Sequence, residues 1–258
     1  MRMRRNLVGW LILAGTLAGI GACKPAFNAA TYPNMDALLK AAMAQYNAKH
    51  YDNAAKAFER LTVELPARDA RVPIAFFYLG KSQEKTGGRL LAAKSYSRIY
   101  EQFPDDTLAD DGLYLSGLAY QAMWRKPELD AEYGTNALTQ FQTLQGLYPN
   151  SPFAAKAAQQ VAILDQWFAT KDFLTGTHYL KRKAYDSAII YFKDVIRLHP
   201  HARKTRDAYL RLLEAYHAIR YTEDARDLCN EMRTAYPNDR EIVKRCPAPP
   251  TPAAAPTT

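Results

Sequence analysis

The side chains of this 258-residue chain that could do chemistry are three cysteines and five histidines. His199 and His201 flank Pro200, but no third side chain stands at the spacing that a zinc site needs. The sequence also has no glycine-rich phosphate loop, no nucleophile elbow and no His-Glu-x-x-His motif. We therefore expect no catalytic residue, no metal ligand and no cofactor. The chemistry that remains is that of the cysteines.

The first cysteine follows a segment with the composition of a secretion signal. A basic start, Met1-Arg2-Met3-Arg4-Arg5, leads into an apolar run from Leu7 to Ile20. A run of about 14 residues is too short for a comfortable membrane span but typical of a signal peptide. It closes with Ile20-Gly21-Ala22-Cys23. This resembles the bacterial lipobox, where a diacylglycerol is added to the cysteine and the chain is cut just before it.

We therefore expect residues 1–22 to be a lipoprotein signal peptide and Cys23 to carry the lipid, at the start of a linker over 23–34. The alternative is an ordinary signal peptide with a chance cysteine. The second mature position holds Lys24 and not aspartate. In the sorting rule known from enteric bacteria, this favours the outer membrane, with the chain anchored by its lipid and facing the periplasm.

One phrase recurs five times in the rest of the chain: an alanine, an aromatic or cysteine four residues later, and a proline eight residues further. A small residue lets two helix backbones approach, the ring one turn later fills the space beside it, and proline ends the helix. Such self-similarity is typical of tetratricopeptide (TPR) helix pairs. The copies are Ala54/Phe58/Pro66, Ala92/Tyr96/Pro104, Ala137/Phe141/Pro149, Ala188/Phe192/Pro200 and Ala225/Cys229/Pro237.

The phrase predicts an all-α fold, a TPR solenoid of about five helix pairs. Repeats one to three occupy 35–149. Repeats four and five lie within 150–246 and follow one unusually long helix, expected from Pro152 to about Leu180 because no proline or glycine interrupts it before Gly176. The proline-rich end, 247–258, is predicted to be a disordered or polyproline-like tail.

The two remaining cysteines would lie in an oxidising periplasm. Cys229 stands in the aromatic slot of the fifth repeat, which predicts a small core residue. Cys246 follows a short helix expected over 239–245. The two could form one disulfide that ties this helix down, but sequence does not supply the geometry, so separate thiols are the alternative.

Charge excludes one class of partner. The formal net charge of +8 falls to +5 without residues 1–22, since 31 basic and 26 acidic residues remain. The charges are interspersed, with no run of four basic residues, so nucleic acid is not an expected partner.

These residues together resemble the BamD-type lipoproteins, also called YfiO or ComL, of the outer-membrane β-barrel assembly (BAM) machinery. The resemblance covers about 23–240. It rests on the lipobox, the five repeats, an enlarged turn within 122–133, and the long helix after Tyr148-Pro149-Asn150-Ser151. Arg197-x-x-Pro200 followed by Thr205-Arg206-Asp207-Ala208 also resembles the family's junction between repeats four and five. Leu65-Pro66-Ala67-Arg68 departs from the aromatic-Pro-Phe-Gly-like segment expected at the end of the first repeat.

The resemblance implies a non-catalytic scaffold held by lipid at the inner leaflet of the outer membrane. Its C-terminal repeats would bind the periplasmic domains of the barrel-inserting outer-membrane protein. Its N-terminal half would receive unfolded β-barrel precursors by their C-terminal, aromatic-ended signal.

Two sets of residues are candidates for these contacts. The first helix of each TPR pair lines the concave groove, where rings beside a lysine would fit an extended peptide that ends in an aromatic residue and a carboxylate. Packing between repeats is the alternative for each ring. The groove candidates are Tyr46, Phe77, Lys81 and Tyr114. The candidates for the partner interface, which could equally be a solvated basic face, are Tyr191, Arg197, Arg203 and Arg206.

Two other functions fit a TPR lipoprotein. It could serve another envelope machine, as a pilus secretin pilotin or a Tol–Pal-linked division coordinator, although such coordinators tend to carry an N-terminal coiled coil that this sequence lacks. It could also be an enzyme that uses TPRs for docking, but no catalytic domain remains once the repeats are counted.

Overall fold

A computed structural model describes residues 27–247 of the chain. The signal peptide, Cys23 and the tail from residue 248 lie outside the described residues. The described part is entirely helical, without a strand. Its elements are η1 (Ala29–Thr31), α1 (Met35–Asn47), α2 (Tyr51–Glu64), α3 (Arg71–Lys85), α4 (Arg89–Gln102), α5 (Ala109–Gln121), α6 (Glu132–Leu147), α7 (Ala154–Lys181), α8 (Tyr185–Leu198), α9 (Thr205–Ala218), α10 (Thr222–Ala235) and α11 (Arg240–Arg245).

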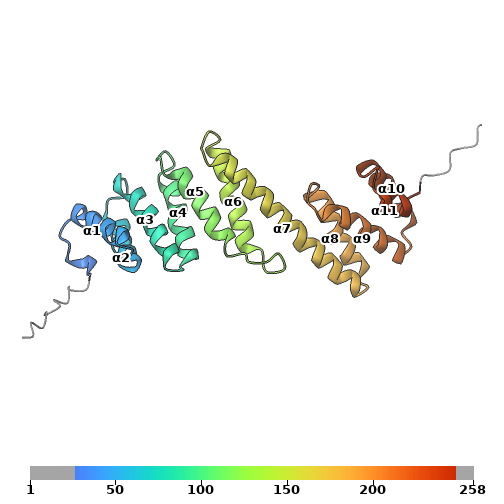
Figure 1. Cartoon of the computed structure of the whole chain (residues 1–258), viewed down its shortest axis with the longest axis horizontal. Helices are drawn as coiled ribbons and strands as arrows, with labels where there is room; N and C mark the ends of the chain where they lie inside the picture. Colours follow the sequence, from blue (N-terminus) through green and yellow to red (C-terminus); the bar gives the residue numbers. More distant parts are fainter. Residues whose placement is uncertain (1–26, 248–258) are drawn as a thin grey trace, which may run out of the picture.

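The helices α1 to α10 stack as five antiparallel pairs into an elongated solenoid, and α11 lies at its C-terminal end (Figure 1). The predicted all-α, TPR-like fold is therefore confirmed. None of the helices between residues 27 and 247 combines the length and apolar character of a membrane span.

The long helix is confirmed as α7, 28 residues that run diagonally through the middle of the solenoid (Figure 1). It begins at Ala154, two residues later than expected. Ser151 makes a turn ahead of the helix, in which its hydroxyl accepts a hydrogen bond from the Phe153 N–H at 3.0 Å. Its face toward α8 and α9 joins the C-terminal core, and its first turns belong to the core of α5 and α6.

The repeated phrase works as the spacing predicts. In the first four copies both the alanine and the ring are fully buried. In three of these pairs the ring lies directly on a glycine of the preceding helix: a Cβ built on Gly117 would come within 2.5 Å of Phe141 Cε1. The other two glycine–ring contacts are Gly80 with Tyr96 and Gly176 with Phe192.

The fifth copy differs from the prediction. Cys229 is half-buried and packs at the margin of the core, whereas Ala225, Leu228 and Met232 are the buried residues of α10. The reason is that the Cys229 sulfur faces α11, where the structure bonds it to Cys246.

The enlarged turn between α5 and α6 packs against α7. Trp124 is 2% exposed and its ring centroid lies 4.7 Å from that of Phe168 and 5.4 Å from that of Trp167. The ammonium group of Lys171 donates to the Leu129 carbonyl oxygen at 2.8 Å. The extra residues of this turn therefore fix the long helix to the third repeat.

The turns inside four of the five pairs contain a residue in the left-handed region. Lys49, Lys183 and Arg220 have φ angles of 62°, 60° and 61°, and Gly87 stands at the corresponding point of the second repeat with φ 88°. This conformation costs about 1–2 kcal/mol for a residue with a Cβ. Three of the turns are therefore strained where glycine would not be.

Candidate functional site

In the N-terminal half, rings of α1 and α3 gather around one lysine. The Tyr46 and Tyr78 ring centroids are 5.0 Å apart, and Phe77 meets Tyr78 edge-on at 5.4 Å. The ammonium group of Lys81 lies 4.5 Å from the centre of the Phe77 ring and 5.9 Å from that of Tyr78, within the range of a cation–π contact. We call Tyr46, Phe77, Tyr78 and Lys81 the aromatic–lysine surface.

All four side chains of this surface are half-buried, and they differ in how they are held. Tyr46 and Tyr78 pack against the core of the first repeat, where Tyr78 stacks on Phe58 at 5.5 Å. Phe77 and Lys81 are not part of that core. Of the predicted groove residues in this surface, Tyr46 therefore belongs to the packing of the first repeat, and Phe77 meets the Tyr96 ring of α4 at 6.3 Å.

Carboxylates stand near this lysine. Asp111 of α5 has a pKa raised mainly by burial and further by Asp110, while Lys81 acts against that rise. Glu84 accepts a hydrogen bond from the Tyr96 hydroxyl at 2.9 Å. Burial, and then Glu84, raises the pKa of Tyr96 above its usual range. The surface thus offers one cation beside rings, with negative charge already present around it.

The fourth groove candidate lies elsewhere. Tyr114 of α5 stacks on Phe153 at 4.9 Å and meets Phe141 at 5.9 Å, in the core of the third repeat. Only Tyr46, Phe77 and Lys81 are brought together, so the four candidates do not form one cluster.

The four interface candidates are also dispersed. Tyr191 stacks on Tyr179 of α7 with ring centroids 5.6 Å apart. Arg197 is exposed and pairs with Asp194 at 2.8 Å. Arg203, between α8 and α9, is exposed, and its backbone N–H donates to the Gln166 side-chain oxygen at 2.8 Å. Arg197 and Arg203 therefore present their charge to solvent.

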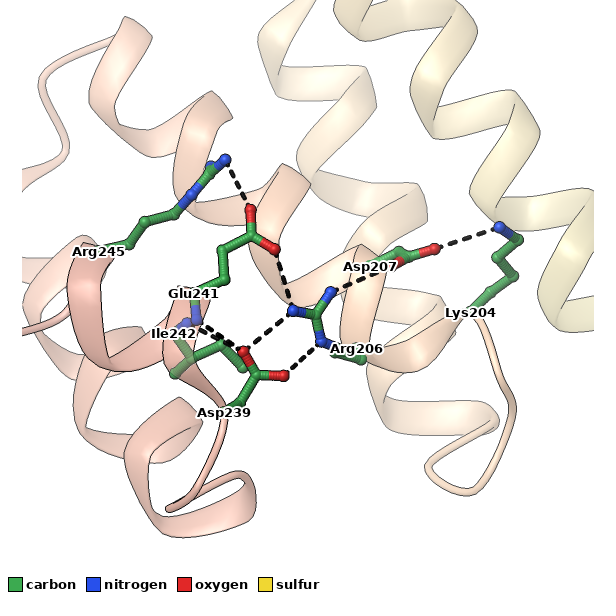
Figure 2. Close-up of polar contacts among 7 residues, drawn as sticks. All are labelled: Lys204, Arg206, Asp207, Asp239, Glu241, Ile242 and Arg245. Atoms are coloured by element: carbon green, nitrogen blue, oxygen red, sulfur yellow. Dashed lines mark hydrogen bonds and ion pairs between the residues drawn. The ribbon is translucent and has the colours of Figure 1, made fainter.

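Arg206 is half-buried and contacts acidic side chains at the start of α11 (Figure 2). Its guanidinium donates to both carboxylate oxygens of Asp239, at 2.6 and 3.0 Å, and to Glu241 at 3.0 Å. The hydrogen bonds that Asp239 accepts, first from Arg206 and then from the backbone N–H of Ile242, lower the pKa of its carboxyl group to about 2. Arg245 continues the network to Glu241 at 2.9 Å. Arg206 thus fastens α11 to α9.

A covalent link holds the same helix at its other end. The structure joins Cys229 of α10 to Cys246 by a disulfide, with Cα atoms 5.2 Å apart. One guanidinium nitrogen of Arg233 donates to the carbonyl oxygens of Cys246 and Pro247 at 3.3 and 3.2 Å. Ile242 of α11 is fully buried between these contacts.

His199, one of the two histidines that flank Pro200, contacts acidic side chains of the long helix. His199 Nδ1 lies 2.6 Å from an Asp165 oxygen, and Nε2 lies 4.0 Å from Asp172, both on α7. Burial raises the pKa of Asp172, and His199 opposes this rise. Among residues 27–247 no group of three histidine, cysteine or acidic side chains could hold a metal ion.

Three residues that matter here were not predicted. Tyr78 follows Phe77 directly, and helical spacing alone did not decide which of the two rings faces outward. Asp239 and Glu241 lie more than 30 residues from Arg206. An available signal was the sequence Asn238-Asp239 ahead of a short helix, which is an N-cap pattern.

Comparison with models of protein families identifies the family of this chain. The model of the family described as "YfiO: Outer membrane lipoprotein" matches residues 32–232. The chain belongs to this family. The YfiO match spans all five helix pairs up to α10 and leaves α11 outside. Membership confirms the predicted place at the outer membrane and agrees with a non-catalytic protein.

Curated relatives of this YfiO chain share one description, "Outer membrane protein assembly factor BamD". That of Neisseria gonorrhoeae is 26% identical over 218 residues, 79% of this chain and 80% of the relative. That of Caulobacter vibrioides is 28% identical over 146 residues, 57% of this chain and 48% of the relative. That of Vibrio cholerae is 26% identical over 176 residues, 62% of this chain and 73% of the relative.

Among solved structures the chain resembles TPR proteins. A thermophilic TPR protein of Thermus thermophilus is 21% identical with a TM-score of 0.36, over 82% of this chain and 96% of the other. The TPR2AB domain of yeast Sti1 is 14% identical with a TM-score of 0.41, over 82% and 81%.

Proposed function

We propose that this lipoprotein is an outer membrane protein assembly factor: a non-catalytic scaffold that binds the barrel-inserting protein of the outer membrane and unfolded β-barrel precursors. The YfiO match over 32–232 supports the proposal, together with a relative described as an outer membrane protein assembly factor that is aligned over 80% of its length. The helical stack supports it, since a solenoid provides extended surfaces for other proteins.

Affinity purification tests the scaffold role. The lipidated chain, tagged at its C-terminus, is extracted from its own outer membrane in mild detergent. We expect a large β-barrel protein with periplasmic domains to co-purify in a fixed ratio. Recovery of a pilus secretin or of Tol–Pal proteins instead would assign the chain to another envelope machine and refute the proposal.

We place the precursor site at the aromatic–lysine surface. A precursor that ends in an aromatic ring and a carboxylate would stack its ring on Phe77 and pair its carboxylate with the Lys81 ammonium, which already lies 4.5 Å from the Phe77 ring. A charge-assisted contact of this kind adds about 1 kcal/mol when partly desolvated. The surface lies within the first two repeats, the half in which the resemblance expects precursors.

Binding of a synthetic peptide tests this site. The probe is a twelve-residue β-strand peptide that ends in phenylalanine with a free carboxylate, compared with its C-terminal amide. Lys81→Ala is expected to weaken the free acid about five- to tenfold and the amide little, which corresponds to about 1 kcal/mol. Phe77→Ala should weaken both. The control is Lys85→Ala, at the exposed end of the same helix. Equal affinities for all variants would remove the site.

A further inference from the structure

A groove lies in the C-terminal part of the solenoid, away from the aromatic–lysine surface. It runs between α8 and α10, the second helices of the last two repeats. It encloses about 550 Å³, within the usual range of ligand pockets. Its floor is formed by Leu212 and Tyr216 of α9, which are 2% and 4% exposed. At its edge on α8 stands Ile190, which is 59% exposed. The groove thus offers an apolar floor and an apolar edge without a covering element among the described residues.

The walls of this groove are unequal in charge. The α10 wall carries Asp224, Asp227 and Glu231, and the α8 wall carries Lys193, Asp194 and Arg197. Two of these charges are neutralised locally: Asp194 pairs with Arg197 at 2.8 Å. The groove therefore has a formal excess of two negative charges, in a chain whose formal net charge is +8.

The negative excess faces solvent on the α10 side. Asp224 and Asp227 are exposed, and the contact of Asp227 with Arg226 is long, at 3.8 Å, with both side chains more than 70% exposed. On the opposite wall Arg197 pairs with Asp194. The exposed Lys193 places its ammonium 5.6 Å from the centre of the Tyr216 ring, where Asp224 also favours its charged form. An incoming ligand therefore meets carboxylates on one side and an apolar surface below.

We propose that this groove binds an amphipathic helix of another protein, with an apolar stripe bordered by lysine or arginine. The stripe covers Ile190 and the floor, and the basic border faces Asp224 and Asp227. Two parallel helical walls over an apolar floor form the usual receptor for such a helix. Charge complementarity selects a basic helix over an acidic one. The site is separate from the aromatic–lysine surface. It includes Arg197, one of the residues expected at the partner interface, but its test with model helices does not require that the partner be the barrel-inserting protein.

The test uses the whole mature chain and two fourteen-residue model helices, one of leucine and lysine at helical spacing and one with glutamate in place of lysine. Fluorescence anisotropy at 150 mM salt measures their binding. We expect the lysine helix to bind and the glutamate helix not to. Asp224→Lys combined with Asp227→Lys should weaken the lysine helix about tenfold and allow the glutamate helix to bind. Ile190→Ser should weaken the lysine helix about threefold or more.

A matched control carries the same change of net charge away from the groove. Asp105→Lys combined with Glu128→Lys replaces two exposed acids and is expected to change lysine-helix affinity less than about twofold. Absence of lysine-helix binding, or equal weakening by both double variants, would overturn the proposal. Binding that rises more than tenfold when residues 248–258 are removed would assign the groove to the chain's own tail. Self-association abolished by Ile190→Ser would assign it to a second copy.

Discussion

A single methyl group at Gly117 tests how the helix pairs are packed. Gly117 lies in α5, and Phe141 of α6 rests on it: a Cβ would stand 2.5, 2.7 and 2.9 Å from three atoms of the ring. Phe141 is fully buried and its other side meets Tyr114. The ring therefore has little room to move when Gly117 is replaced by alanine.

Two effects oppose each other in Gly117→Ala. Alanine in a helix interior is favoured over glycine by about 0.5–1 kcal/mol. Overpacking a filled core costs about 1–3 kcal/mol. Contacts below 3.0 Å require the ring or the helix to shift. We therefore expect the cost of overpacking to exceed the gain in helix propensity, so that the free energy of unfolding falls by about 1–2 kcal/mol. For a domain of this size this lowers the melting midpoint by about 2–8 °C.

Gly146→Ala is the matched control. Gly146 lies in the neighbouring helix α6, and a Cβ there would meet nothing within 4 Å. It should raise the midpoint by about 1–4 °C. Both variants are measured by circular dichroism at 222 nm, and Phe141→Leu is expected to restore part of the loss caused by Gly117→Ala. If Gly117→Ala raises the midpoint as Gly146→Ala does, the Phe141 ring is free to move and does not hold the two helices in close contact at Gly117.

Three further predictions concern the turns and the C-terminal end. Cys229→Ser combined with Cys246→Ser removes a bridge across 17 residues and should destabilise the attachment of α11 by about 3 kcal/mol, visible as faster amide exchange in α11. Because the pKa of Asp239 is lowered to about 2, its ion pair with Arg206 stabilises the attachment of α11 fully above pH 4, and this stabilisation is lost as the pH falls toward 2. The methyl NMR signals of Ile242 should therefore shift between pH 4 and pH 2, and already at pH 7 in Asp239→Asn. Lys183→Gly should stabilise the chain by about 1 kcal/mol in chemical unfolding, because φ is 60° there, whereas Gln159→Gly, at an exposed position in the interior of α7, should destabilise it.

Local spacing was enough to predict the helices and their pairing. The alanine, the ring and the proline act within one helix or on its direct partner, so their effect is readable along the chain. The same holds for α7, whose length follows from the absence of proline and glycine between Phe153 and Gly176.

Contacts between distant segments could not be predicted in this way. In the sequence Arg206 looks like part of a solvated basic face. In the structure its charge is paired with Asp239 and Glu241, which come near it only because α11 packs against α9. Tyr114 has the phase of a groove residue, yet Phe153 of the next connection covers it. In both cases the deciding partner belongs to an element whose position depends on tertiary packing.

The proposed role of the chain in the assembly of outer-membrane β-barrels can be measured by depleting the chain in its source bacterium and quantifying folded barrel proteins by their heat-modifiable migration in gels. We expect folded barrels to decrease while lipoproteins of the outer membrane persist. Unchanged levels of folded barrels after depletion would refute this role.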